Sequence, residues 1–219
     1  CGQDAAEPSS VPSEAAETPE AASGLVILCE ADEDMINNYS LLAVNPDAPF
    51  VDADGSSVAD VYINTEGAAA LINWMLSAEG EAAAADYGYA EYGEYLFYLA
   101  DGAPVSTAEI PRATDETRVI RMSTTTSVND SGLLGYLLPM FEDEYGYEVE
   151  VTSAGTGKAI ANAESGNADV LLVHSKSQEE EFVAAGYSYV LPGFESERLT
   201  FLYNYFVLCL SLIHISEPT

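Results

Sequence analysis

Apolar and polar positions along the chain form alternating blocks that predict an α/β protein. Short apolar runs typical of strands lie at 25–28 and 41–44, and between 66 and 79 the apolar residues recur at helical spacing. From 118 onwards the pattern predicts strands at 118–122, 147–152 and 168–173, each followed by a helix, at 131–146, 158–164 and 177–185. This order predicts parallel strands with right-handed crossovers. A further strand is expected at 198–208.

The same pattern divides the chain into segments. Residues 1–23 are rich in Ala, Glu, Ser and Pro and are expected to form a disordered tether, while 100–117 has no apolar period and is expected to be a linker between the segments 24–99 and 118–208. Residues 209–219 resemble translated sequencing-adapter sequence and are excluded from the fold, so His214 is given no functional weight. The 219 residues suffice for one medium α/β domain or two lobes.

The net charge of the chain argues against two classes of binding partner. Asp and Glu total 37 against 6 Lys and Arg, which gives a formal net charge of -31. A field of this sign repels nucleic acid and anionic membrane surfaces, so neither is expected as a partner. The sequence has no run of 18 or more apolar residues, and a membrane-spanning helix is therefore not predicted.

The three cysteines are far apart, so they predict neither a zinc site nor a redox disulfide. Cys29 follows an apolar run and is expected to be a small buried hydrophobe. Cys1, followed by Gly2 and the polar segment, resembles the start of a mature bacterial lipoprotein. The resemblance implies lipid attachment at Cys1 and a protein anchored at the extracellular face of the cytoplasmic membrane. An arbitrary start of the chain is the alternative.

Two polar segments lie where a strand is expected to end and a helix to begin. The first, 123–127, is a run of hydroxyl residues, and the second, 153–157, combines Ser153 and Thr156 with Gly155 and Gly157. The strand ends of an open parallel sheet are where ligands bind, and free helix N–H groups there favour anions. Charge-assisted hydrogen bonds contribute about 1.5–3 kcal/mol each, so several neutral donors suffice for a tetrahedral oxyanion. Lys158 either adds a counter-charge or points to solvent.

Two enzymatic interpretations of these residues are weaker than an anion-binding site. The segment from Gly155 to Lys158 departs twice from a P-loop, because Thr152 replaces the required glycine and Ala159 the hydroxyl residue. A nucleophilic hydroxyl would need a base such as His174, at the end of the strand 168–173. His174 is interpreted either as a ligand contact at the same sheet edge or as a structural histidine.

Three motifs together resemble the opening third of the tungstate-binding proteins of ABC importers. They are the run 123–134 with its Ser-Thr-Thr-Thr-Ser and Asp-Ser-Gly-Leu-Leu stretches, Gly-Thr-Gly-Lys-Ala at 155–159, and Ala-Asp-Val-Leu-Leu-Val-His at 168–174. Segment 24–99 resembles the closing part of the same family, at 29–33, 42–46 and 72–80. The family's end thus precedes its beginning, which a circular permutation, a tandem fusion or a faulty assembly would each produce.

The resemblance implies a type II periplasmic-binding-protein-like α/β fold, with a parallel or mixed sheet and flanking helices, incomplete and permuted. It implies a monomeric, non-enzymatic solute-binding protein that captures tungstate or a similar oxyanion for an ABC permease, without a cofactor. The ligand residues it implies are Thr125, Thr126, Ser127, Gly155, Thr156 and Gly157, with His174 and Ser175 as weaker candidates. The family's middle portion, which carries an arginine used on the oxyanion, is missing. A phosphate-site enzyme and a fragment that binds nothing are the alternatives.

Overall fold

The computed structural model describes residues 25–29 and 32–211. The expected lipid attachment at Cys1, the tether 1–23 and His214 lie outside the described residues. The chain divides into two compact units, one of residues 1–30 with 207–219 and the other of residues 31–206.

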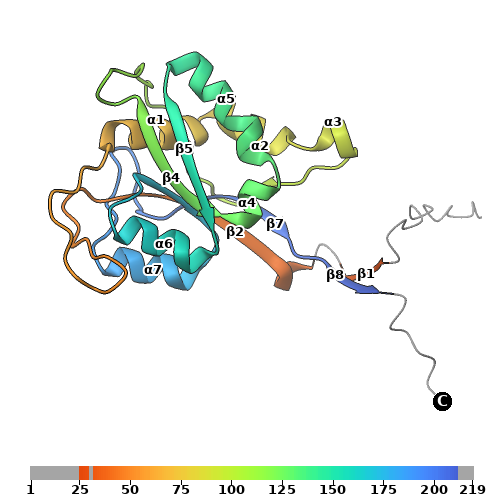
Figure 1. Cartoon of the computed structure of the whole chain (residues 1–219). Helices are drawn as coiled ribbons and strands as arrows, with labels where there is room; N and C mark the ends of the chain where they lie inside the picture. The colour runs from red at the N-terminus through yellow and green to blue at the C-terminus, as the bar shows by residue number, and fades with distance from the viewer. Residues whose placement is uncertain (1–24, 30–31, 212–219) are drawn as a thin grey trace, which may run out of the picture. The chain divides into compact units, whose positions relative to one another are not determined.

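The described part of the first unit is a pair of antiparallel strands, β1 (Leu25–Cys29) and β8 (Leu208–Ser211) (Figure 1). The strand predicted at 25–28 is confirmed. Ile27 pairs with Cys209, so residues that the sequence analysis excluded from the fold take part in this pair. The expectation of a buried Cys29 is wrong, because this side chain is only half-buried in a two-stranded ribbon that carries exposed apolar residues.

The second unit is built on a six-stranded mixed sheet with the order β3-β7-β2-β6-β4-β5. Its strands are β2 (Ile36–Ala43), β3 (Tyr98–Leu99), β4 (Val119–Thr125), β5 (Glu148–Ala154), β6 (Val170–Val173) and β7 (Leu199–Tyr205). β5, β4 and β6 are parallel, as the βαβαβα pattern predicts, whereas β2, β7 and β3 are joined antiparallel. Strands from both 24–99 and 118–208 therefore belong to one sheet, as expected for one fold.

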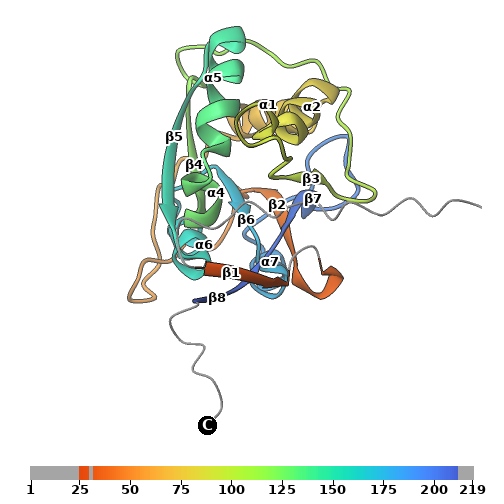
Figure 2. The ribbon, with the colours of Figure 1, turned by 90° about the vertical axis from the view of Figure 1, so that its right-hand side faces the viewer.

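Helices cover both faces of this sheet (Figure 2). They are α1 (Thr65–Met75), α2 (Ala78–Asp86), α3 (Tyr89–Tyr92), α4 (Thr126–Asp130), α5 (Leu133–Tyr145), α6 (Thr156–Glu164) and α7 (Lys176–Ala184), with a 3-10 turn at Glu33–Met35. α1 and α5 contribute to one apolar core, and α6 and α7 to a second. Adjacent residues of β2 and β6 point into different cores, for example Leu41 and Leu42. β6, a central strand, is apolar throughout because both of its faces are buried.

Two helix boundaries differ from the sequence-based expectation. The single helix expected at 66–79 ends at Met75, and Ser77 starts α2, its Oγ accepting a hydrogen bond from Gly80 N at 3.2 Å. Local side-chain capping by serine competes with helix continuation. The helix expected at 177–185 begins one residue earlier, because Ser175 is the N-cap residue of α7 and Lys176 is its first helical residue.

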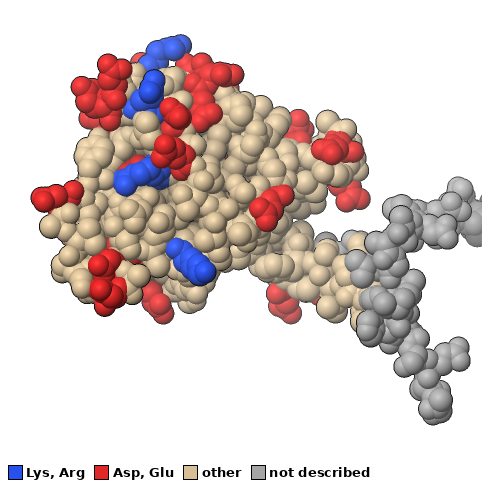
Figure 3. All heavy atoms as spheres, viewed as in Figure 1, with Lys and Arg blue, Asp and Glu red and all other residues tan. Residues whose placement is uncertain are grey.

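Most acidic residues of the described ranges lie on the surface, and Figure 3 shows them spread over the face that it views. None of the helices in the described ranges is long and apolar enough to cross a membrane. Trp74 is fully buried against Phe141, with ring centroids 5.6 Å apart.

Glu81 on α2 is one of three buried acidic residues in the described ranges, with Asp169 and Glu179, and it is only 7% exposed. Its Oε1 atom has no hydrogen-bond partner among the described residues, and burial raises the pKa of the carboxyl above its usual value. A carboxyl whose pKa is higher in the folded than in the unfolded state binds more protons when folded, so stability falls as pH rises through that interval.

We therefore expect Glu81→Gln to raise the free energy of unfolding by about 1 kcal/mol at neutral pH, because the charged form no longer has to be buried. The gain should disappear when the pH is lowered far enough to protonate Glu81. Urea unfolding of both chains across the acidic range measures this difference. Glu91→Gln, at an exposed position, is the control. A gain that stays constant with pH would contradict the explanation.

Candidate functional site

The two polar segments predicted from the sequence lie at the same edge of the sheet. β4 and β5 are parallel neighbours, and their last paired residues are Thr125 and Ala154. β6 also runs parallel to β4 and ends at the same edge, just before His174. The carboxyl ends of three adjacent strands therefore lead into α4, α6 and α7. This confirms the shared edge, which is the arrangement typical of ligand sites in open α/β sheets.

The first segment is only partly a loop. β4 continues through Ser123 and Thr124 to Thr125, and all three are buried. Ser123 Oγ donates to Ala159 O at 2.9 Å, and Thr124 Oγ1 donates to Leu172 O at 2.7 Å. Ser123 thus binds β4 to α6, and Thr124 binds β4 to its neighbour β6 within the sheet. The expectation of a five-residue hydroxyl loop was wrong because it ended the strand at Met122.

The remaining three residues of this segment are placed at the edge. Thr125 Oγ1 and Ser127 Oγ lie 3.1 Å apart in a hydrogen bond, and Thr126 and Ser127 are exposed in α4. The helix expected to follow directly is interrupted, because α4 has five residues and Gly132, with a φ of 83°, precedes α5. A positive φ suits glycine, which explains the break. The long helix α5 thus begins away from the strand end.

The second segment joins β5 directly to α6. Gly155 is the N-cap residue of α6 and has no side chain to cap it, while Thr156 and Gly157 are the first helical residues. Lys158 N donates to Gly155 O at 2.9 Å. The amides of Thr156 and Gly157 precede the first hydrogen bonds of the helix, and such groups are available to an acceptor from outside. Gly157, Lys158 and Gly155 are exposed, and Thr156 is partly so.

His174 and Ser175 connect β6 to α7. Ser175 is the N-cap residue of α7, but its side chain makes no capping hydrogen bond. The His174 ring packs edge-on against Tyr39, with centroids 5.5 Å apart, and also lines a pocket that extends toward β2 and β7. His174 thus makes a structural contact with Tyr39 and also faces an open pocket.

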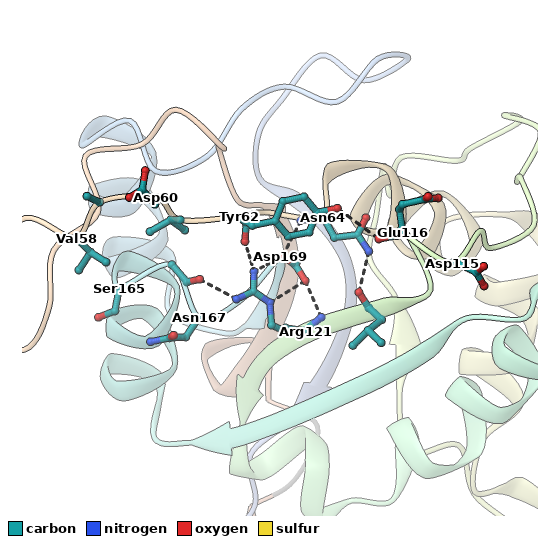
Figure 4. Close-up of a pocket in the computed structure, with 14 residues that line it drawn as sticks. Val58, Asp60, Tyr62, Asn64, Asp115, Glu116, Arg121, Ser165, Asn167 and Asp169 are labelled. Carbon is teal, nitrogen blue, oxygen red and sulfur yellow. Dashed lines mark hydrogen bonds and ion pairs between the residues drawn. The ribbon is translucent and has the colours of Figure 1, made fainter.

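A different pocket, of about 500 Å3, lies at the opposite edge of the sheet (Figure 4). It surrounds Arg121, whose guanidinium forms an ion pair with the fully buried Asp169 at 2.6 Å. The same guanidinium donates to Tyr62 O at 2.6 Å and to Gly166 O at 2.9 Å. Asp169 Oδ1 also accepts from Asn64 N at 2.9 Å. The pocket wall is therefore a satisfied hydrogen-bond network.

This network links the two halves of the chain. Asn64 caps α1 through Gly67 N at 2.9 Å, and its Nδ2 donates to Thr117 O and Val119 O at 2.7 and 2.8 Å. Asp169 and Arg121 belong to the later segment. This cluster was not predicted from the sequence. The sequence offered one signal for it, an aspartate immediately before the buried strand β6. A charge buried at such a position requires a partner.

The chemistry of the candidate edge is that of hydrogen-bond donors. Within the described residues, no group of three or more His, Cys, Asp or Glu side chains is placed to hold a metal ion. The edge offers instead the hydroxyls of Thr125, Thr126, Ser127 and Thr156 with the first amides of α6. Such donors suit an oxygen-rich anion, which accepts hydrogen bonds and interacts favourably with the positive end of a helix dipole.

Residues 110–210 match a family model described as a PBP superfamily domain. Over 89 residues the chain is 53% identical to the tungstate-binding protein TupA of Peptoclostridium acidaminophilum, which covers 41% of this chain and 29% of that protein. A putative ABC transporter anion-binding protein of Haloferax volcanii is 46% identical over 71 residues, covering 32% of this chain and 21% of the relative.

A solved structure, the tungstate-binding protein TupA from Desulfovibrio alaskensis G20, is 46% identical and has a TM-score of 0.31, covering 31% of this chain and 27% of the other. The chain spans less than a third of the length of the curated relatives that it matches. The residues matched by the family model, 110–210, include the parallel strands β4, β5 and β6 with their helices.

Proposed function

We propose that this protein is the solute-binding component of an ABC importer and that it captures a tetrahedral oxyanion, tungstate in the first place. The observation that carries the proposal is the shared edge, where the ends of β4 and β5 bring the hydroxyls at 125–127 beside the first turn of α6. Thr125, Thr126, Ser127, Gly155, Thr156 and Gly157 are the proposed ligand residues, with His174 and Ser175 as further candidates.

The names of the relatives support the choice of ligand, because two of them are called tungstate-binding and one anion-binding. Binding by neutral donors is also consistent with the net charge of -31, since an oxyanion bound in this way needs no basic surface. We propose no enzymatic step, because the relatives' names describe binding. The partners of this proposal are the oxyanion and an ABC permease.

The proposed location follows from the same role. A solute-binding component works outside the cytoplasmic membrane, and lipid attachment at Cys1 would hold a monomer at the extracellular face. Intact mass measurement of the protein purified from a bacterial membrane fraction tests this part, because acylation adds the mass of the lipid chains. An unmodified Cys1 in the membrane-derived protein would contradict the anchor and would leave the ligand proposal unaffected.

The domain assignment is a proposal as well. We propose that 24–99 corresponds to the closing part of the family's fold and 118–208 to its opening lobe. The uninterrupted genomic reading frame tests this assignment. A frame that continues beyond Leu208 into the family's middle portion would support it, and permease and ATPase genes beside the frame would support transport.

Thermal unfolding of this chain in millimolar tungstate tests the ligand proposal. A ligand at ten times its Kd stabilises the folded state by about 1.4 kcal/mol, which raises the unfolding temperature of a chain of this size by about 3–5 °C. We expect Thr156→Val to reduce the shift, because it removes a donor at nearly constant shape. Thr107→Val, at an exposed linker position, is the matched control. Equal shifts in the two variants would contradict the placement of the site.

A further inference from the structure

A pocket of about 760 Å3 opens beside the candidate edge, between the end of β6, the start of β2 and the end of β7. We call it the basic pocket, because three of its eleven lining residues are His174, Lys176 and Arg198. The whole chain has only 8 residues of these types, 6 Lys and Arg with 2 His. One of its 37 acidic residues, Asp101, lines the pocket. Basic side chains are therefore concentrated here, in an otherwise acidic protein.

Arg198 is held in place from behind the pocket. Its Nε and Nη2 atoms donate to Oε2 of Glu179 at 2.8 and 2.6 Å, and Glu179, on α7, is only 1% exposed. Nη2 also approaches Ser40 Oγ at 3.5 Å. Nη1 has no hydrogen-bond partner among the described residues. A guanidinium fixed by a buried carboxylate presents its remaining donors in a defined direction, and such donors match phosphate and carboxylate oxygens.

The other walls add neutral donors and aromatic rings. Thr200 and Asn37 line the basic pocket, and so do Tyr203 and Tyr205, whose rings lie edge-to-face at 5.5 Å. Burial, with a smaller contribution from Tyr205, raises the pKa of Tyr203, so that its hydroxyl stays protonated and able to donate. One end of the pocket is thus basic, and another offers aromatic surface, which suits the body of an organic molecule.

We infer that the basic pocket binds a small organic anion, whose phosphate or carboxylate group lies at Arg198, Lys176 and His174 and whose body lies against Tyr203 and Tyr205. The size supports an organic ligand, because pockets for such molecules measure about 300–1,000 Å3 and an inorganic oxyanion fills only a small part of that volume. This site adjoins the donor edge of the proposed function, but its ligand and its residues differ, apart from His174.

Titration calorimetry with a matched series of probes tests the inference. Glucose 6-phosphate and glucuronate share one sugar ring and differ in their anionic group, glucose carries no charge, and inorganic phosphate lacks the organic body. We expect both sugar anions to bind more tightly than glucose, and glucose 6-phosphate to bind more tightly than inorganic phosphate. Glucose binding as tightly as the two sugar anions would overturn the inference. If inorganic phosphate binds as tightly as glucose 6-phosphate, Tyr203 and Tyr205 do not contribute to binding, and this result would also overturn the inference.

Two lysines make a matched pair of variants. Lys176 and Lys158 both lie in the first turn of a helix at the same sheet edge, and both are exposed, but Lys176 lines the basic pocket. An exposed charge contributes roughly 0.2–1 kcal/mol, so Lys176→Gln should weaken glucose 6-phosphate binding about two- to fivefold. Lys158→Gln should leave it unchanged. Equal weakening by both variants would reveal only a general charge effect and would overturn the inference.

Arg198→Lys keeps the charge beside Glu179 but removes the planar fork of donors, and should weaken binding about tenfold or more. Circular dichroism and thermal unfolding check that the Arg198→Lys protein is folded. If it is not folded, the test rests on Lys176→Gln, which lies at an exposed position. Thr156→Val separates this inference from the proposed function. It should not change binding of glucose 6-phosphate, and a loss of that binding would assign the organic anion to the donor edge instead.

Discussion

Replacing Asp169 by alanine is expected to lower the free energy of unfolding by about 3–5 kcal/mol, because it removes the fully buried acceptor of several hydrogen bonds and leaves the partly exposed Arg121 guanidinium without its partner. Asp169 accepts hydrogen bonds from Asn64 N and from the backbone and side chain of Arg121, all between 2.6 and 3.2 Å. Its loss therefore also leaves backbone donors without partners at the point where the two halves of the chain meet. Equilibrium unfolding in urea measures the change.

The exposed ion pair between Lys176 and Glu180, 3.8 Å apart, supplies the control. Glu180→Gln should change the free energy of unfolding by less than about 0.5 kcal/mol, because an exposed i,i+4 pair contributes little. Asp169→Asn keeps the shape and part of the hydrogen bonding, so its loss of unfolding free energy should lie between those of Asp169→Ala and Glu180→Gln. A small effect of Asp169→Ala would mean that the two halves are held together elsewhere, and the role given to this network would be wrong.

The second large effect concerns the length of the chain. This chain spans less than a third of the length of its curated relatives. Its resemblance to tungstate-binding proteins implies that the sequence lacks a middle portion with an oxyanion-binding arginine. We expect a chain extended to the full length of its relatives to bind tungstate roughly a hundredfold to a millionfold more tightly than this one. The basis is that two or three charge-assisted hydrogen bonds contribute about 1.5–3 kcal/mol each, and about 1.4 kcal/mol corresponds to a tenfold change in Kd.

Isothermal titration of both chains with tungstate measures this difference, and titration with chloride at matched ionic strength controls for non-specific effects. Equally tight binding by both chains would show that the donors of this segment alone form the site. The absence of binding in both would contradict the proposal that tungstate is the ligand.

The parallel part of the fold could be predicted from the sequence because its signals are local. The apolar run at 168–173 and the alternation at 147–152 indicated β6 and β5, and glycines marked the ends of α5 and α7. The antiparallel placement of β2 between β6 and β7 could not be derived in this way, because it depends on pairing between residues more than 120 positions apart, such as Ser40 with Val173. Local propensity carries no information about such pairing.

The candidate site was predicted in position but not in detail. The order of strands and helices placed the segments around Thr125 and Gly155 at one edge, because parallel strands end on the same side of a sheet. Ser123 and Thr124 were expected to lie in a loop but extend the strand, since a hydroxyl run looks the same in either case. The basic pocket was not predicted, because it collects Asn37, His174 and Arg198 from three distant parts of the sequence.

The central claim is that the donors at the ends of β4 and β5 bind an oxyanion, and Thr156 tests it most directly. In the chain extended to full length, calorimetric titration should show that Thr156→Val weakens tungstate binding roughly ten- to hundredfold, the equivalent of one charge-assisted hydrogen bond. Thr107→Val should leave the Kd unchanged. An unchanged Kd in the Thr156→Val protein would show that tungstate binds elsewhere and would contradict the account.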